Sequence, residues 1–137
     1  MQVENAHTPG PEQLAHFFGD GESGSFTMLN LLKFRDKAQY ADGSNPGLSG
    51  REAYARYGAA VQACIAKVGA RQIYAGAVTG LMIGEVEDLW DMVAMVEYPS
   101  LAAFQQMIAL PEYQAAHRHR EAGLDGQLNI KTQALAR

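Results

Sequence analysis

The residues best suited to chemistry lie on a helix predicted after Pro111. Tyr113, His117 and Arg120 fall at positions i, i+4 and i+7, so a helix would place them on one face. That face would offer a phenol, an imidazole that titrates near neutral pH, and a guanidinium that can bind a carboxylate. If it lines a pocket, His117 and Tyr113 are the candidate catalytic residues, with His117 as a general acid or base, and Arg120 anchors the substrate.

The same face also has a purely structural interpretation. Tyr113 could pack in the core, and His117 could be half exposed, because the spacing places no partner carboxylate beside it. Arg120 could form an ion pair with an acidic residue such as Glu121 or Glu97. Both interpretations remain open from the sequence.

Three further polar side chains are candidates for substrate binding. Asn30 interrupts an apolar strand pattern, and a buried amide without a partner costs about 1–3 kcal/mol. It must therefore bind either a neighbouring strand or loop, or a ligand. Tyr54 and Tyr57, on a helix predicted to face Arg120, could donate further hydrogen bonds.

The sequence indicates no metal site and no cofactor. His117 and His119 are two residues apart, so on a helix their side chains diverge and cannot easily share an ion. A paired-histidine zinc motif and a cysteine cluster are both absent from the sequence. The glycines Gly76, Gly80 and Gly84 do not form a phosphate-binding loop, since no suitable helix follows them.

The composition is typical of one soluble domain. The chain has 137 residues, of which 47% are hydrophobic and 19% charged. A net charge of −4 without a basic cluster argues against nucleic acid as a partner, and no apolar run approaches the ~20 residues that span a bilayer. Cys64, the single cysteine, is expected to pack on a helix. With no basic and apolar leader sequence, a cytoplasmic location is expected.

Prolines and capping residues mark the expected helices. Ser100 is suited to cap a helix over 100–109, and Pro111 to begin another over 111–122. Ser49 and Glu52 match a capping box, which predicts a helix that ends at Gly69.

Strands are expected at 26–34, 72–83, 90–98 and 124–135. A short helix over 11–19 should precede them, between a poorly ordered start at 1–11 and a glycine-rich turn at 20–25. After that 1–25 extension the order is βαββαβ. It predicts a single α+β domain over 1–137 with a ferredoxin-like antiparallel sheet and two main helices on one face.

Both faces of two strands are apolar. The strands 26–34 and 90–98 carry hydrophobic residues at odd and even positions alike, which indicates a sheet covered on both sides. So short a chain can cover only one side with its own helices. A partner subunit, in a homodimer, is expected on the open face.

Several motifs resemble one known family. Tyr98-Pro99-Ser100, Ala103-Phe104 and Pro111-Glu112-Tyr113-Gln114, followed by Arg120, resemble the thirteen-thirty domain-of-unknown-function family of the dimeric α+β barrel superfamily. The resemblance covers roughly Phe26 to the C-terminus. It implies a homodimer whose two sheets face each other as a barrel, with a pocket between sheet and helices in each subunit.

The resemblance implies no reaction. Shorter members tend to carry a glutamate before the glycine that closes the second strand, whereas here Ile83 precedes Gly84, so no role of that glutamate transfers. Haem held by His117 would follow only from analogy with other barrels.

The function expected from the sequence is a homodimer that binds a small, partly apolar organic anion and acts on it without a metal. Two alternatives stay open. The first is a non-catalytic ligand carrier or interaction subunit, and the second is a haem-dependent barrel enzyme.

Overall fold

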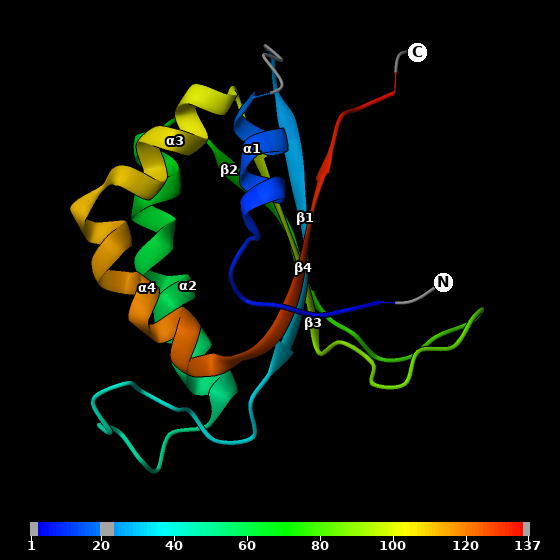
Figure 1. Cartoon of the computed structure of the whole chain (residues 1–137), viewed down its shortest axis with the longest axis vertical. Helices are drawn as coiled ribbons and strands as arrows, with labels where there is room; N and C mark the ends of the chain where they lie inside the picture. Colours follow the sequence, from blue (N-terminus) through cyan, green and yellow to red (C-terminus); the bar gives the residue numbers. More distant parts are fainter. Residues whose placement is uncertain (1–2, 20–23, 136–137) are drawn as a thin grey trace.

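The computed structural model describes residues 3–19 and 24–135. Eight elements follow along the chain (Figure 1): α1 Pro11–Gly19, β1 Phe26–Phe34, α2 Gly50–Lys67, β2 Arg71–Ala77, β3 Met92–Tyr98, α3 Leu101–Ala109, α4 Pro111–Gly123 and β4 Leu124–Thr132. Most of the turn expected at 20–25 and the first two residues lie outside the described residues.

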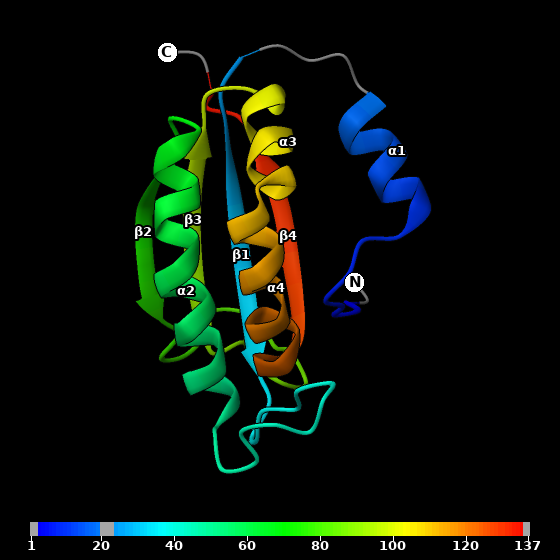
Figure 2. The same cartoon turned by 90° about the vertical axis from the view of Figure 1, so that its left-hand side faces the viewer.

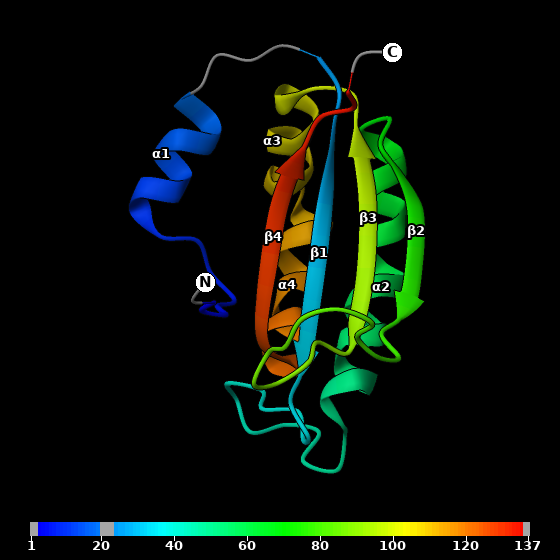
Figure 3. The same ribbon diagram turned by 90° about the vertical axis from the view of Figure 1, so that its right-hand side faces the viewer.

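The four strands form one antiparallel sheet in the order β2-β3-β1-β4. Helices α2, α3 and α4 cover one face of it, as Figure 2 shows. Figure 3 shows the opposite face without helices, and α1 standing beside the β4 edge. The fold is therefore the ferredoxin-like α+β arrangement that the order of elements predicts. None of the described helices is long and apolar enough to cross a membrane.

Local capping explains where the helices begin and end. The Ser49 hydroxyl accepts from the Glu52 backbone N–H at 3.0 Å, and the Glu52 carboxylate accepts from the Ser49 N–H at 3.0 Å, which confirms the capping box. Ser100 caps α3 through the N–H of Ala103 at 3.1 Å. Gly69, just beyond α2, adopts a φ of 75°, a left-handed conformation that glycine reaches without strain.

The second strand is shorter than the sequence pattern predicts. Pairing ends at Ala77, opposite Met92, and the Val78 N–H to Asp91 carbonyl bond at 2.9 Å closes the ladder. The following segment, residues 78–91, leaves the sheet as a long loop that we call the β2–β3 arm (Figure 1). The predicted strand 72–83 was therefore wrong beyond residue 77, because those residues have no opposite strand to pair with.

The main core fills the space between the sheet and the helices. Phe26, Met28, Val96 and Tyr98 contribute from the sheet, and α2 and α3 close over them. Cys64 is fully buried on α2, and burial raises the pKa of its thiol. This agrees with its expected packing role.

Candidate functional site

A cavity of about 810 Å³ lies on the helix side of the sheet. Its walls come from β1, β3, β4, α2, α3 and α4, together with the N-terminal segment and α1. All six candidate residues from the sequence border it: Asn30, Tyr54, Tyr57, Tyr113, His117 and Arg120. The structure thus brings residues from three separate elements to one cavity.

A chain of polar contacts forms one side of the cavity. Asn30 donates from Nδ2 to the Ala94 carbonyl on β3 at 3.2 Å, and its Oδ1 accepts from Gln127 Nε2 at 2.8 Å. Gln127 Oε1 in turn accepts from Arg120 Nη2. The half-buried amide therefore has protein partners, as the structural interpretation of Asn30 requires, while it still borders the cavity.

Arg120 has neutral partners. Its Nη1 donates to the backbone carbonyl of His7 at 2.8 Å and its Nη2 to the Gln127 amide. Neither acidic residue expected as its ion partner takes that role, since Glu97 pairs with Arg71 at 3.1 Å and Glu121 lies 3.5 Å from His117. Among the described residues, the structure thus shows no ion pair of Arg120 with either carboxylate.

His117 has a carboxylate neighbour that the spacing could have predicted. Its Nδ1 lies 3.5 Å from Glu121 Oε1, one helical turn further along α4. Burial nevertheless lowers the pKa of His117, and the Arg120 guanidinium lowers it further, against the opposing effect of Glu121. The imidazole is therefore mainly neutral at neutral pH.

The tyrosines stand close together beside His117. The rings of Tyr54 and Tyr57 are 5.3 Å apart between centroids, those of Tyr57 and Tyr113 6.2 Å, and those of Tyr113 and His117 6.1 Å. Burial raises the pKa of Tyr54 to about 12 and that of Tyr57 well above its usual value. Both phenols therefore stay protonated and can act as hydrogen-bond donors.

The other side of the cavity is apolar and aromatic. Phe17 from α1 packs edge-on against Phe26, at 5.9 Å between ring centroids, and its ring is tilted against that of Phe104, at 5.3 Å. Phe104 also meets Tyr98 edge-on at 5.0 Å. The buried Met28 and Met107 belong to the same lining. The cavity thus combines one polar and one apolar side.

Two residues that border the cavity were not identified as site candidates from the sequence. Gln127 is 8% exposed and links Asn30 to Arg120, but the sequence pattern places it only within the strand expected at 124–135. His7 lies in the segment expected to be poorly ordered, and no sequence signal marks its contact with Arg120, because 113 residues separate them.

The histidines of α4 face different surroundings, as their spacing predicts. His119 Nδ1 lies 2.6 Å from the Tyr40 hydroxyl, whereas His117 borders the cavity. Within residues 3–19 and 24–135, no three His, Cys, Asp or Glu side chains lie close enough to hold a metal ion.

Solved structures share this fold at two levels of similarity. A protein of unknown function from Rhodopseudomonas palustris is 33% identical, with a TM-score of 0.87 over 98% of this chain and 100% of its own. A dimeric ferredoxin-like protein of unknown function from Bacteroides fragilis is 17% identical, with a TM-score of 0.54 over 81% and 97%. A Dabb-family protein from Mesorhizobium loti is 14% identical, with a TM-score of 0.52 over 82% and 99%. The last two support the fold alone.

A sequence comparison adds the family. No curated protein matches this chain. A family described as Domain of unknown function (DUF1330) matches residues 45–132, which is most of the chain. The matched range includes every helix and strand from α2 to β4. The match begins later than Phe26, where the sequence motifs placed it. Because the match covers more than half of the chain, it shows that this chain belongs to the DUF1330 family.

Proposed function

We propose that this protein binds a small, partly apolar organic anion in the cavity between the sheet and the helices, and that it does so as a homodimer. The observation that carries the proposal is the guanidinium of Arg120. It borders the cavity, and the partners that the structure gives it are a backbone carbonyl and a side-chain amide.

The charge of Arg120 favours an anionic ligand. A guanidinium stays protonated at any physiological pH, and a partly buried charge is stabilised by an opposite charge. In the described part of the chain, no carboxylate lies within ion-pair distance of it. Partners among the described residues use two of its five N–H groups, which leaves donors for the oxygens of a carboxylate.

The aromatic side of the cavity favours an apolar body on the same molecule. Phe17, Phe104 and Met107 offer apolar surface, and burying apolar area there contributes about 25 cal/mol per Å². A ligand with its anionic group at Arg120 and its apolar part against these rings would satisfy both sides.

His117 and Tyr113 extend the proposal to chemistry without a metal. Glu121 favours the His117 tautomer with its proton on Nδ1, so that Nε2 keeps a lone pair that can accept a proton. The lowered pKa of His117 keeps that base available at neutral pH. Tyr113 would then supply a hydroxyl beside it. In a ligand carrier, the same residues would only shape the cavity.

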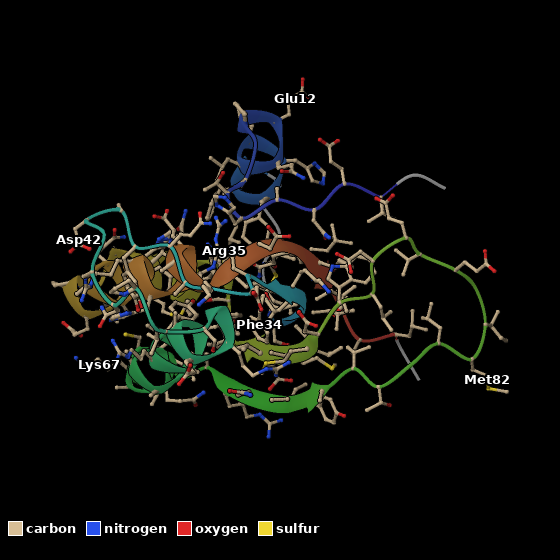
Figure 4. All side chains as sticks on the ribbon, turned by 90° about the horizontal axis from the view of Figure 1, so that it is seen from below. Glu12, Phe34, Arg35, Asp42, Lys67 and Met82 are labelled. Atoms are coloured by element: carbon tan, nitrogen blue, oxygen red, sulfur yellow. The ribbon has the colours of Figure 1, made fainter. Side chains whose placement is uncertain are left out.

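The open face of the sheet supports the homodimer. In the sheet register, Leu29 lies opposite Met95, and Leu31 opposite both Val93 and Leu128, so these five residues share one face of the sheet. It is the face opposite to that of the buried Met28 and Leu32. Figure 3 shows that helices do not cover it. The β2–β3 arm projects beyond this face, with Met82 near its tip (Figure 4). Met82 and the next residue, Ile83, are 98% and 86% exposed. A second copy would bury both surfaces, and the related fold from Bacteroides fragilis is described as dimeric.

Native mass spectrometry of freshly purified protein, followed by denaturation, tests binding and assembly together. We expect a dimer that carries extra mass, released on denaturation as an organic acid, and we expect Arg120→Gln to be purified without it. The released acid can then be incubated with ligand-free protein. Conversion by the wild type but not by His117→Gln would identify an enzyme, whereas recovery of the unchanged acid would identify a carrier.

A further inference from the structure

Arg120 meets a neutral side chain at a point where a carboxylate would cancel its charge. Its Nη2 donates to Oε1 of Gln127, which borders the same cavity from β4. Glutamine and glutamate have nearly the same shape, so a glutamate at position 127 would form an ion pair with the guanidinium. The chain has an amide there instead. The contact therefore holds Arg120 without neutralising it.

The direction of this chain of amides is fixed at its far end. The Ala94 carbonyl on β3 can only accept a hydrogen bond, so the Asn30 amide must turn its Nδ2 toward it, at 3.2 Å. That orientation leaves Asn30 Oδ1 as the acceptor for Gln127 Nε2, at 2.8 Å. The oxygen of the Gln127 amide then faces Arg120, which is the arrangement that satisfies all three contacts.

The backbone fixes the position of Gln127 as well. On one side of β4, Gln127 lies opposite the fully buried Leu32 of β1. On the other side, its carbonyl accepts from the Ala6 N–H at 3.2 Å. The neighbouring glycine permits this close approach, since a Cβ on Gly126 would lie 2.5 Å from the Cβ of Asn5. The strand is therefore held on both sides at the point where its side chain meets the guanidinium.

We propose that Gln127 determines the specificity of the cavity for anions, because its neutral amide positions the Arg120 guanidinium and leaves the positive charge to the ligand. Asn30 is a positioning residue behind it, since it fixes which way the Gln127 amide points. This inference rests on the proposed function and deepens it: Arg120 supplies the charge, and Gln127 decides whether a ligand can use it. Gln127→Glu, which exchanges one NH₂ group for an oxygen, should therefore abolish the selection of acids.

Calorimetric titration of decanoate and decanol into the wild type, Gln127→Glu and Gln133→Glu tests the proposal. The wild type should bind the acid about tenfold more tightly than the alcohol, the effect of hydrogen bonds to a charged group. Gln127→Glu should lose that factor for decanoate and keep its affinity for decanol, because the new carboxylate pairs with Arg120. Gln133→Glu makes the same exchange at an exposed position just beyond β4, and should keep the preference for the acid.

The imidazole of His117 reports on the same contact without any ligand. Arg120 lowers the pKa of His117, so a carboxylate that pairs with Arg120 should raise it. NMR titration should therefore give a higher pKa of His117 in Gln127→Glu than in the wild type, and an unchanged one in Gln133→Glu. The same pKa of His117 in all three proteins would show that the side chain at position 127 does not reach the charge, and would overturn the proposal.

Asn30→Ala tests the positioning step in a variant that introduces no charge. Without Asn30 the Gln127 amide is free to turn, so decanoate should bind several-fold more weakly and decanol as before. The loss should disappear in the double variant with Arg120→Gln, because Asn30 acts through that guanidinium. An equal loss of decanoate binding in both backgrounds would refute this role of Asn30 and show that it contacts the ligand directly.

The results separate this proposal from the one beneath it. If the wild type prefers decanoate to decanol but Gln127→Glu keeps that preference, the role of Gln127 is refuted and the anion site stands. If the wild type binds neither probe, or binds both alike, both proposals fail.

Discussion

His117 shows how the cavity selects the charge state of a single residue. Its pKa lies below the usual value of 6.5, because burial and the Arg120 guanidinium both disfavour the imidazolium. Glu121 acts in the opposite direction and is the weaker influence. The site therefore holds a neutral base beside a fixed positive charge.

This lowered pKa predicts a stability that falls in acid. The unfolded chain binds a proton at His117 more readily than the folded chain, so the free energy of unfolding decreases as the pH falls below about 6.5. Between pH 7 and pH 5, the melting temperature of His117→Gln should therefore fall less than that of the wild type. Some loss should remain in this variant, because burial also lowers the pKa of His119. Melting curves across this range measure it.

The control is His16→Gln, which replaces an exposed imidazole on α1. It should follow the wild-type curve. A His117→Gln curve as steep as that of the wild type would show that the imidazole is not disfavoured in the folded state.

How much of the site the sequence could predict depends on how far apart along the chain the residues of each contact lie. Tyr113, His117 and Arg120 share a helix face, so local periodicity sufficed, and it should also have identified Glu121 at i+4 of His117. Asn30 was recognisable because an amide interrupted an apolar pattern. His7 and Gln127 were not recognised, because their contacts with Arg120 and Asn30 join distant parts of the chain and leave no pattern in the sequence.

At the level of elements, two glycines set the distance between α2 and α4. A Cβ on Gly123 would lie 2.5 Å from the Gly50 carbonyl oxygen and 2.8 Å from the Tyr54 nitrogen. The last turn of α4, which carries Arg120, therefore packs directly on the first turns of α2. This contact holds Tyr54 and Arg120 at the same cavity.

Gly123→Ala should separate the two helices. The added methyl has no room, so we expect the free energy of unfolding to fall by about 1–3 kcal/mol, together with weaker binding of decanoate. Chemical denaturation measures the first effect and titration the second.

Gly58→Ala is the matched control in α2. A Cβ there meets nothing within 4 Å, so the change should stabilise the helix by about 0.5–1 kcal/mol. Equal effects of the two substitutions would contradict the close-approach argument.

Elements were predictable where local chemistry defines them. The caps at Ser49 and Ser100 and the start at Pro111 involve neighbouring residues, and the corresponding helices were predicted within a few residues of their observed ends. β2 was predicted too long, because the end of a strand depends on the length of its partner β3. The N-terminal segment was predicted to be loose because it lacks periodicity, whereas a distant edge strand holds it.

At the level of the whole molecule, the two faces of the sheet differ in what they present. The helix side contains the cavity, and the open side presents the apolar patch of β1, β3 and β4. Lys33 joins the base of the β2–β3 arm to this side, with Nζ 3.0 Å from Asp88 and 3.6 Å from Asp91. These contacts raise the pKa of Lys33, the Asp88 hydrogen bond most of all.

A charge on the open face should therefore disrupt assembly. Met95 lies opposite Leu29 in the sheet, and Met95→Lys would place an ammonium inside the expected dimer interface. Light scattering should show the mass falling from twice 14.9 kDa to 14.9 kDa. Ala59→Lys, on an exposed position of α2, should remain dimeric. A wild type that is itself monomeric would refute the homodimer.

The claim that joins these levels is that Arg120 gives the cavity its preference for anions. Calorimetric titration of decanoate and of decanol into the wild type, Arg120→Gln and Arg118→Gln tests it most directly. Arg118 is an exposed arginine on the same helix that pairs with Asp42 at 3.8 Å, so its loss leaves the cavity unchanged. We predict that the wild type and Arg118→Gln bind decanoate at least tenfold more tightly than decanol, and that Arg120→Gln binds the two alike. Equal binding of acid and alcohol by the wild type, or a preference for the acid that survives in Arg120→Gln, would contradict the account.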